Sequence, residues 1–136
     1  MPRKPKALVF DSWAVLAYLG DEAASKEVAD LIASAHEDRV PMYMSTVNAG
    51  EVWYIIAREA SESEADKAMA DLTRLGIELI DMNWPLARTA GAFKARHKMS
   101  YADCFAAALA KDRKSDLVTG DKEFKQIEAE ITIRWL

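Results

Sequence analysis

The sequence predicts an α/β fold in which helices cover both faces of a parallel sheet. Short apolar segments alternate along the chain with longer amphipathic stretches. Strands that are separated by helices form crossover units, and crossover units build parallel sheets. The chain has 136 residues, the usual size of one domain, and its sequence contains no linker or internal repeat. We therefore expect residues 1–136 to fold as a single domain.

Five short apolar segments, each bounded by polar or turn-forming residues, are predicted to be strands. They cover residues 7–10, 42–45, 77–80, 117–119 and 131–133. Six longer segments are predicted to be helices, at residues 13–19, 22–36, 48–57, 61–75, 83–98 and 100–111. Ser61 and Glu64 fit a capping box at the start of the fourth helix. Gly76 follows that helix, at the position where a left-handed backbone conformation is favoured.

The composition limits the class of protein. An apolar share of 51% and a charged share of 29% are ordinary for a soluble globular protein. No apolar run approaches the roughly 18 residues that span a bilayer. The basic residues 1–6 precede too short an apolar run for a signal peptide. Because Cys104 is the only cysteine, we expect no intramolecular disulfide, and we expect a cytoplasmic protein that does not contact a membrane.

Four acidic residues stand beside predicted strand ends or helix starts. Asp11 directly follows the first predicted strand, and Asp121 follows the fourth. Glu51 is expected in the first turn of the helix after the second strand. Asp103 is expected in the first turn of an Ala-rich helix.

Each of these acids, taken alone, has an ordinary structural interpretation. Two of them stand three residues after a capping residue, as in a capping box (Asn48 with Glu51, Ser100 with Asp103). Asp11 and Asp121 fit the caps of the elements that follow them. Carboxylates near helix N-termini are also stabilised by the helix dipole. For any single acid, capping therefore remains open as its role.

Considered together, the four acids predict a metal site. Loops at the carboxyl ends of parallel strands meet in one crevice, and Asp11, Glu51 and Asp121 all fall at that edge. Asp103 joins them if its helix begins there. Carboxylates gathered without basic partners repel one another, but they suit a hard divalent cation such as Mg²⁺. Such a site can activate water against a phosphodiester. The net charge of −4 is compatible with this, because metal-binding carboxylates supply much of it.

Four segments resemble the acidic motifs of PIN domains, in the same order and over nearly the whole chain. They are Phe10-Asp11-Ser12 with Ala14-Val15-Leu16 after it, Asn48-Ala49-Gly50-Glu51-Val52, residues 100–110 around Asp103, and residues 117–124 around Asp121. At this length the chain is most similar to the VapC group of toxins.

The resemblance implies a five-stranded parallel sheet of order 3-2-1-4-5 and an endoribonuclease that uses Mg²⁺ or Mn²⁺. It also implies a homodimer, an RNA substrate and inhibition by a partner antitoxin. By motif position, Asp11, Glu51, Asp103 and Asp121 would form the metal-binding cluster. Thr119 would supply the hydroxyl group that orders it.

Two other functions remain open. The segment around Asp11 partly resembles the nucleophile motif of haloacid-dehalogenase-like phosphohydrolases. That interpretation leaves Glu51 and Asp103 without a role, and it requires a second acid near Asp121, where Lys122 and Lys125 stand. A non-catalytic PIN-fold binding module is the other alternative, and the loss of one or more acids would favour it.

Basic and aromatic residues raise two further questions. The densest basic stretch runs from Arg88 to Lys98 and contains Lys94, Arg96 and His97. It is either a solvated helix face or a rim that follows RNA phosphates. Four large aromatic residues are expected to anchor the core or a dimer interface (Trp13, Trp53, Tyr54 and Trp84).

Overall fold

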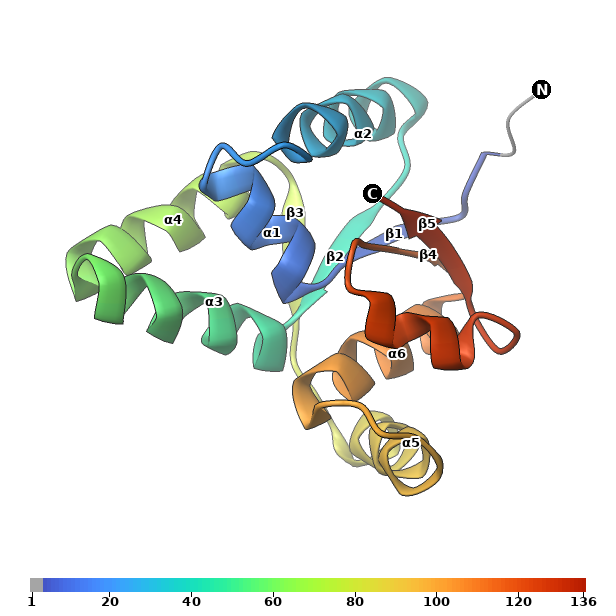
Figure 1. Ribbon diagram of the computed structural model, residues 1–136. Coiled ribbons are helices and arrows are strands. Elements are labelled where there is room, and N and C mark those ends of the chain that lie inside the picture. The colour runs from blue at the N-terminus through green and yellow to red at the C-terminus, as the bar shows by residue number, and fades with distance from the viewer. Residues whose placement is uncertain (1–3) are drawn as a thin grey trace.

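The computed structural model describes residues 4–136, so residues 1–3 of the basic N-terminal segment lie outside the described part. Its centre is one sheet of five strands: β1 (Leu8–Phe10), β2 (Met42–Ser45), β3 (Ile77–Ile80), β4 (Asp116–Thr119) and β5 (Thr132–Trp135). The strand order is β3-β2-β1-β4-β5, and every neighbouring pair is parallel. The predicted α/β class and the order implied by the family resemblance are both confirmed (Figure 1).

Within residues 4–136, six α-helices and one 3₁₀ helix connect the strands. They are α1 (Ser12–Leu19), α2 (Ser25–Asp38), α3 (Thr46–Glu59), α4 (Glu62–Arg74), α5 (Trp84–Arg96), α6 (Tyr101–Arg113) and η1 (Lys122–Ile127). Figure 1 shows α2 at the top of the view, α1, α3 and α4 to the left, and α5 and α6 at the bottom, around the sheet. Within residues 4–136 no helix is long and apolar enough to cross a membrane.

The sheet separates two hydrophobic cores because successive side chains of a strand point to opposite faces. Leu8 and Phe10 pack into one core with side chains from α1, α2, α3 and α4. Val9, between them, belongs to the second core with side chains from α5, α6 and η1. This burial on both sides explains why β1 is a continuous apolar run. It also fixes the carboxyl end of β1 in the middle of the sheet.

Two helix starts differ from the sequence prediction. Helix α2 begins at Ser25, three residues later than expected, because Asp21 takes a positive φ of 52° in a turn that precedes it. Helix α3 begins at Thr46, because the Ser45 side chain accepts a hydrogen bond from the Asn48 backbone N–H at 3.0 Å. The end of α4 follows the prediction, since Leu75 is its C-cap and Gly76, the next residue, adopts a φ of 90°.

Candidate functional site

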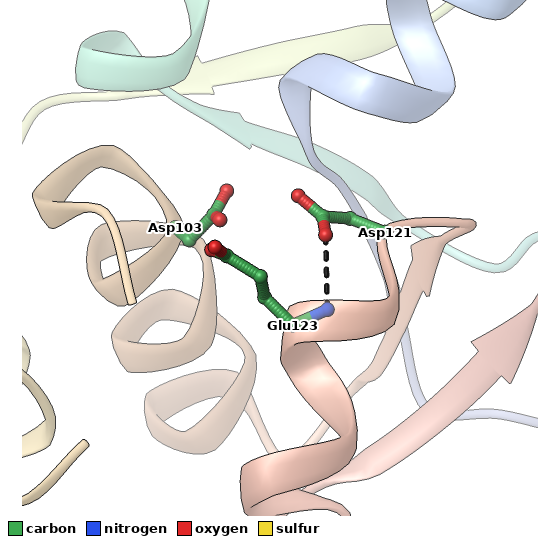
Figure 2. Close-up of side chains that lie close together, drawn as sticks. All are labelled: Asp103, Asp121 and Glu123. Carbon is green, nitrogen blue, oxygen red and sulfur yellow. Dashed lines mark hydrogen bonds between the residues drawn. The ribbon is translucent and has the colours of Figure 1, made fainter. Parts of the chain in front are cut away.

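The carboxyl ends of β1 and β4 lie side by side, and an acid of the candidate site follows each of these strands. Asp11 follows β1, and Asp121 follows β4 after Gly120. Helix α6 begins at the same edge and places Asp103 in its first turn. Figure 2 shows Asp103, Asp121 and Glu123 directed toward one another from α6 and from the start of η1. One carboxylate oxygen from each of these three lies within 4.8 Å of the other two.

Asp11 is both a helix cap and a buried acid. Its side chain is 0% exposed, and its Oδ1 atom accepts a hydrogen bond from the Ala14 backbone N–H at 2.9 Å. Its Oδ2 atom accepts a hydrogen bond from the Thr119 hydroxyl at 2.5 Å. Burial raises the pKa of Asp11 to about 7 against these two hydrogen bonds, and the charges of Asp121 and Glu51 raise it further. Asp11 therefore does cap α1 through its Oδ1 atom, and its Oδ2 atom makes a separate hydrogen bond to Thr119.

Thr119 connects Asp11 to the loop that carries Asp121. Its Oγ1 atom donates to Asp11 and also accepts a hydrogen bond from the Asp121 backbone N–H at 3.0 Å. The Asp121 side chain in turn accepts from the Glu123 backbone N–H at 3.0 Å and caps η1 (Figure 2). One hydroxyl group thus fixes the relative positions of the two acids that follow neighbouring strands.

Asp103 has an environment that disfavours its charge. Burial is the main cause that raises the pKa of Asp103 to about 8, and the negative charges of Asp121 and Asp11 follow. A hydrogen bond with Glu123 acts in the same direction. The Ser100 hydroxyl accepts from the Asp103 backbone N–H at 3.1 Å, which confirms Ser100 as the cap of α6. The Asp103 carboxylate thus faces Asp121 and Glu123 (Figure 2).

Glu51 lies one turn further along its helix than the sequence predicted, because α3 begins at Thr46. It therefore does not form a capping box with Asn48. Its charge raises the pKa of Asp11, and its helix starts directly after β2, at the carboxyl edge of the sheet. It lies outside the group of three carboxylates formed by Asp103, Asp121 and Glu123.

Glu123 is a member of the cluster that the sequence analysis missed. Glu123 falls within the fourth acidic motif without a predicted role, but the 3₁₀ turn at η1 directs its side chain back toward Asp103. One feature of the sequence could have indicated this role of Glu123. It stands two residues after Asp121, and Asp121 caps the tight turn that reverses the chain there. A 3₁₀ helix of six residues leaves no periodic pattern by which to detect it.

Asn48 is a second residue whose role differs from the sequence prediction. Its side chain is fully buried, with Oδ1 accepting from the Ser45 hydroxyl at 2.5 Å. Its Nδ2 atom donates to the Ser12 hydroxyl at 3.3 Å and to the Ala102 carbonyl at 3.1 Å. These bonds join the end of β2 and the starts of α1, α3 and α6. Asn48 thus positions the helix that carries Asp103 beside the helix that follows Asp11.

The cluster has no basic counterion among residues 4–136. No Lys, Arg or His side chain in that range forms a salt bridge with Asp11, Glu51, Asp103, Asp121 or Glu123. Several carboxylates held together without a cation repel one another, and oxygen-only ligands are those that Mg²⁺ prefers. The residues present therefore fit a hard divalent cation.

The basic stretch is largely engaged in contacts within the protein. Arg96 and His97 both contact the Glu130 carboxylate, at 2.9 Å and 3.2 Å. The Lys94 ammonium group donates to the Met99 carbonyl at 2.6 Å. These three side chains therefore contribute to holding the end of α5 against the neighbouring loops.

The fold and this acidic centre define an α/β protein with a candidate metal site at the carboxyl edge of its sheet. The PIN domain family model matches residues 8–130, so the chain belongs to the PIN-domain family. A search of curated proteins finds no match to the chain.

Solved structures with the same fold cover nearly the whole chain. One is Mycobacterium tuberculosis VapC20, described as a sarcin-ricin loop cleaving toxin, with 20% identity, a TM-score of 0.70, and 93% of this chain and 97% of that chain covered. Another is VapBC2 from Rickettsia felis bound to a promoter DNA fragment, with 17% identity, a TM-score of 0.73, and 96% and 98% covered. A third is DNA-bound VapBC from Salmonella typhimurium, with 18% identity, a TM-score of 0.73, and 94% and 96% covered.

Proposed function

We propose that this protein is a divalent-metal-dependent endoribonuclease and the toxin of a toxin–antitoxin pair. The observation that carries the proposal is the gathering of acidic side chains from β1, α3, α6 and the β4 loop without a basic counterion among the described residues. Membership of the PIN-domain family supports it.

In this proposal Asp11, Glu51, Asp103 and Asp121 hold Mg²⁺ or Mn²⁺, and Glu123 joins them. When bound, the ion supplies a Lewis acid and lowers the pKa of water. The protein's own contribution is to fix the ligands and their protons. Burial keeps the pKa values of Asp11 and Asp103 high, so both carboxyl groups release protons when a cation binds. Thr119 holds Asp11 in place through its hydroxyl group.

The substrate and partners follow from the relatives. VapC20 is described as cleaving the sarcin-ricin loop, and other structures with this fold are toxin–antitoxin complexes. We propose RNA as the substrate, an antitoxin protein as the inhibitor, a homodimer as the active form, and the cytoplasm as the site of action. Residues 1–136 would act as one domain. Sedimentation that shows only a 15 kDa species at tens of micromolar would contradict the dimer.

The direct test is RNA cleavage by the purified protein with Mg²⁺, with EDTA, and with EDTA followed by excess Mn²⁺. We expect internal cleavage with either metal and none in EDTA, and sequencing of the new 5′ ends would identify the preferred site. Activity restored by Zn²⁺ but not by Mg²⁺ would contradict the assignment of a hard-cation site.

The same assay separates the two alternative functions. A protein that binds but never cleaves RNA, and that still binds its antitoxin, would be a non-catalytic module. Phosphatase activity through a covalent intermediate on Asp11 would indicate a haloacid-dehalogenase-like enzyme. The family match and the participation of Glu51 and Asp103 in the electrostatics of the cluster favour the nuclease over that enzyme.

A further inference from the structure

Trp13 lies between the two loops that carry Asp11 and Asp121. It stands in the first turn of α1, two residues after Asp11. The outer end of its six-membered ring rests against Gly120, the residue before Asp121: a Cβ atom added there would lie 2.3 Å from Trp13 Cη2. A side chain at position 120 would therefore displace the indole. The absence of a Cβ at Gly120 allows an aromatic ring to sit at the border of the acidic centre.

Trp13 is partly exposed, so it does not anchor the core, and its alternative role at a dimer interface stays a prediction. Its side chain is 38% exposed, and it belongs to neither hydrophobic core. Within residues 4–136 its indole N–H makes no hydrogen bond, whereas those of Trp53 and Trp135 donate to Asp66 and Glu128. The ring thus packs against Gly120, which precedes Asp121, and it is partly exposed two residues after Asp11.

The acidic charge of the site favours an RNA contact that needs no basic side chain. The carboxylates offer RNA phosphates no attraction until a cation is bound, and the side chains of Arg96, His97 and Lys94 are already paired within the protein. Stacking of a base on an aromatic ring requires no charge on the protein and tolerates any base. An acidic protein can bind single-stranded RNA in this way.

We propose that Trp13 stacks against a nucleobase next to the phosphodiester that enters the acidic centre. The inference rests on the proposed function, and it deepens it by assigning a base contact beside the phosphodiester that is cleaved. Bases within a duplex are stacked on one another and hydrogen-bonded, so they do not offer a free face to the indole. The position of the ring between the Asp11 and Asp121 loops restricts the stacked base to the immediate neighbourhood of the scissile bond.

The test measures RNA binding in EDTA, where cleavage does not interfere. The probes are a pool of short single-stranded RNAs of random sequence and a fully paired RNA duplex. We expect Trp13→Ala to raise Kd for the single strands roughly 5- to 100-fold, the range that loss of one stacked base produces. Trp13→Phe should recover part of the loss because it restores an aromatic face. Gly120→Ala should weaken binding although the indole remains, because the new Cβ displaces it.

Trp84→Ala is the matched control, because Trp84 is 73% exposed and lies at the start of α5. It should bind single strands as the unsubstituted protein does. Thermal unfolding of each variant shows whether it is folded, and the Phe and Gly120 variants test the inference if Trp13→Ala is not. Unchanged Kd in the folded Trp13 variants, equal binding of duplex and single strands, or no RNA binding by the unsubstituted protein would each overturn the inference.

The outcomes for the two proposals can be told apart. Binding of single strands that depends on Trp13, without cleavage in Mg²⁺, would sustain the stacking role and overturn the nuclease. Cleavage in Mg²⁺ with the same KM in unsubstituted protein and Trp13→Ala would sustain the nuclease and overturn the stacking role. If both proposals are correct, KM should rise in Trp13→Ala by a larger factor than kcat falls.

Discussion

The side-chain amide of Asn48 donates a hydrogen bond to the backbone carbonyl of Ala102 at 3.1 Å, across 54 positions of sequence. Ala102 immediately precedes Asp103, so this bond fixes the first turn of α6 against the start of α3. The same amide donates to Ser12, the residue after Asp11. Asn48, a neutral side chain, thus links the elements that carry Asp11 and Asp103, and within residues 4–136 it makes no hydrogen bond with either carboxylate.

Replacing Asn48 should therefore affect both stability and activity. We expect Asn48→Ala to lower the free energy of unfolding by about 1–3 kcal/mol, since it leaves buried polar groups unpaired. It should also reduce cleavage in Mg²⁺, because Asp103 loses its fixed position. Denaturant unfolding and a cleavage assay on the same preparation measure the two effects.

Asn83→Ala is the matched control, because Asn83 caps α5 through an ordinary side-chain bond to the Leu86 backbone N–H. Loss of that cap should cost about 1 kcal/mol and leave cleavage unchanged. If both Asn variants lose activity in proportion to stability, Asn48 is only a structural residue.

Much of this site could be predicted from the chain path. Asp11 and Asp121 follow neighbouring strands, and the sheet order puts the ends of those strands together. The cap of α3 could not be predicted in the same way, since Ser45 and Asn48 are both good capping residues three positions apart. Because β2 ends at Ser45, that residue caps α3. Asn48 then lies inside the first turn of the helix, and its side chain is buried.

Glu123 and Trp13 escaped prediction for a different reason. Their roles depend on contacts with residues distant in sequence: Glu123 with Asp103, and Trp13 with Gly120. A lone glutamate in a short 3₁₀ helix and a lone tryptophan in a short α-helix have no pattern in sequence that distinguishes them from surface residues.

Glu123→Gln tests whether the residue that sequence analysis missed belongs to the metal site. We expect weaker Mg²⁺ binding and slower cleavage, because the substitution removes one negative charge from the group of three carboxylates. Glu128→Gln is the control on the following loop, where the carboxylate accepts a hydrogen bond from the Trp135 indole. Calorimetric titration with Mn²⁺ compares the two variants. Equal affinities would exclude Glu123 from the site.

Thr119→Val tests the hydroxyl group that connects Asp11 and Asp121. The valine keeps the shape of the side chain but removes the bond that lowers the pKa of Asp11, so that pKa should rise above about 7. The pH at which cleavage reaches half its maximum should move upward, and the maximal rate should fall roughly 10- to 100-fold, as for loss of other groups that orient metal ligands. Thr119→Ser retains the hydroxyl group and should keep the original pH profile. An unshifted profile in Thr119→Val would contradict this role.

The metal-free protein should lose stability as pH rises. Folding raises the pKa values of Asp11 and Asp103 to about 7 and about 8 from an ordinary value of 3.8, so the folded state favours their protonated forms. Their contribution to stability is fully present below the ordinary value and is lost as pH rises through the folded values. We expect the melting temperature in EDTA to be higher near about pH 5 than near about pH 8. Asp11→Asn should reduce this dependence, and a melting temperature that instead increases with pH would contradict the raised pKa values.

The central claim is that the acids act as one metal site and not as independent helix caps. The most direct measurement pairs RNA cleavage in Mg²⁺ with thermal unfolding in EDTA for Asp11→Asn, Asp103→Asn and the double variant. Asparagine caps helices about as well as aspartate, but it removes a charged ligand. We expect each single variant to lose more activity than the roughly 10- to 100-fold typical of residues that only orient ligands.

The double variant should cost little more activity than either single one, because residues that act as a unit are not additive. Melting temperatures in EDTA should hold or rise, since repulsion between the carboxylates is relieved. Variants that continue to cleave RNA while melting several degrees lower would show that these acids are structural caps, and the account of a metal-dependent ribonuclease would be wrong.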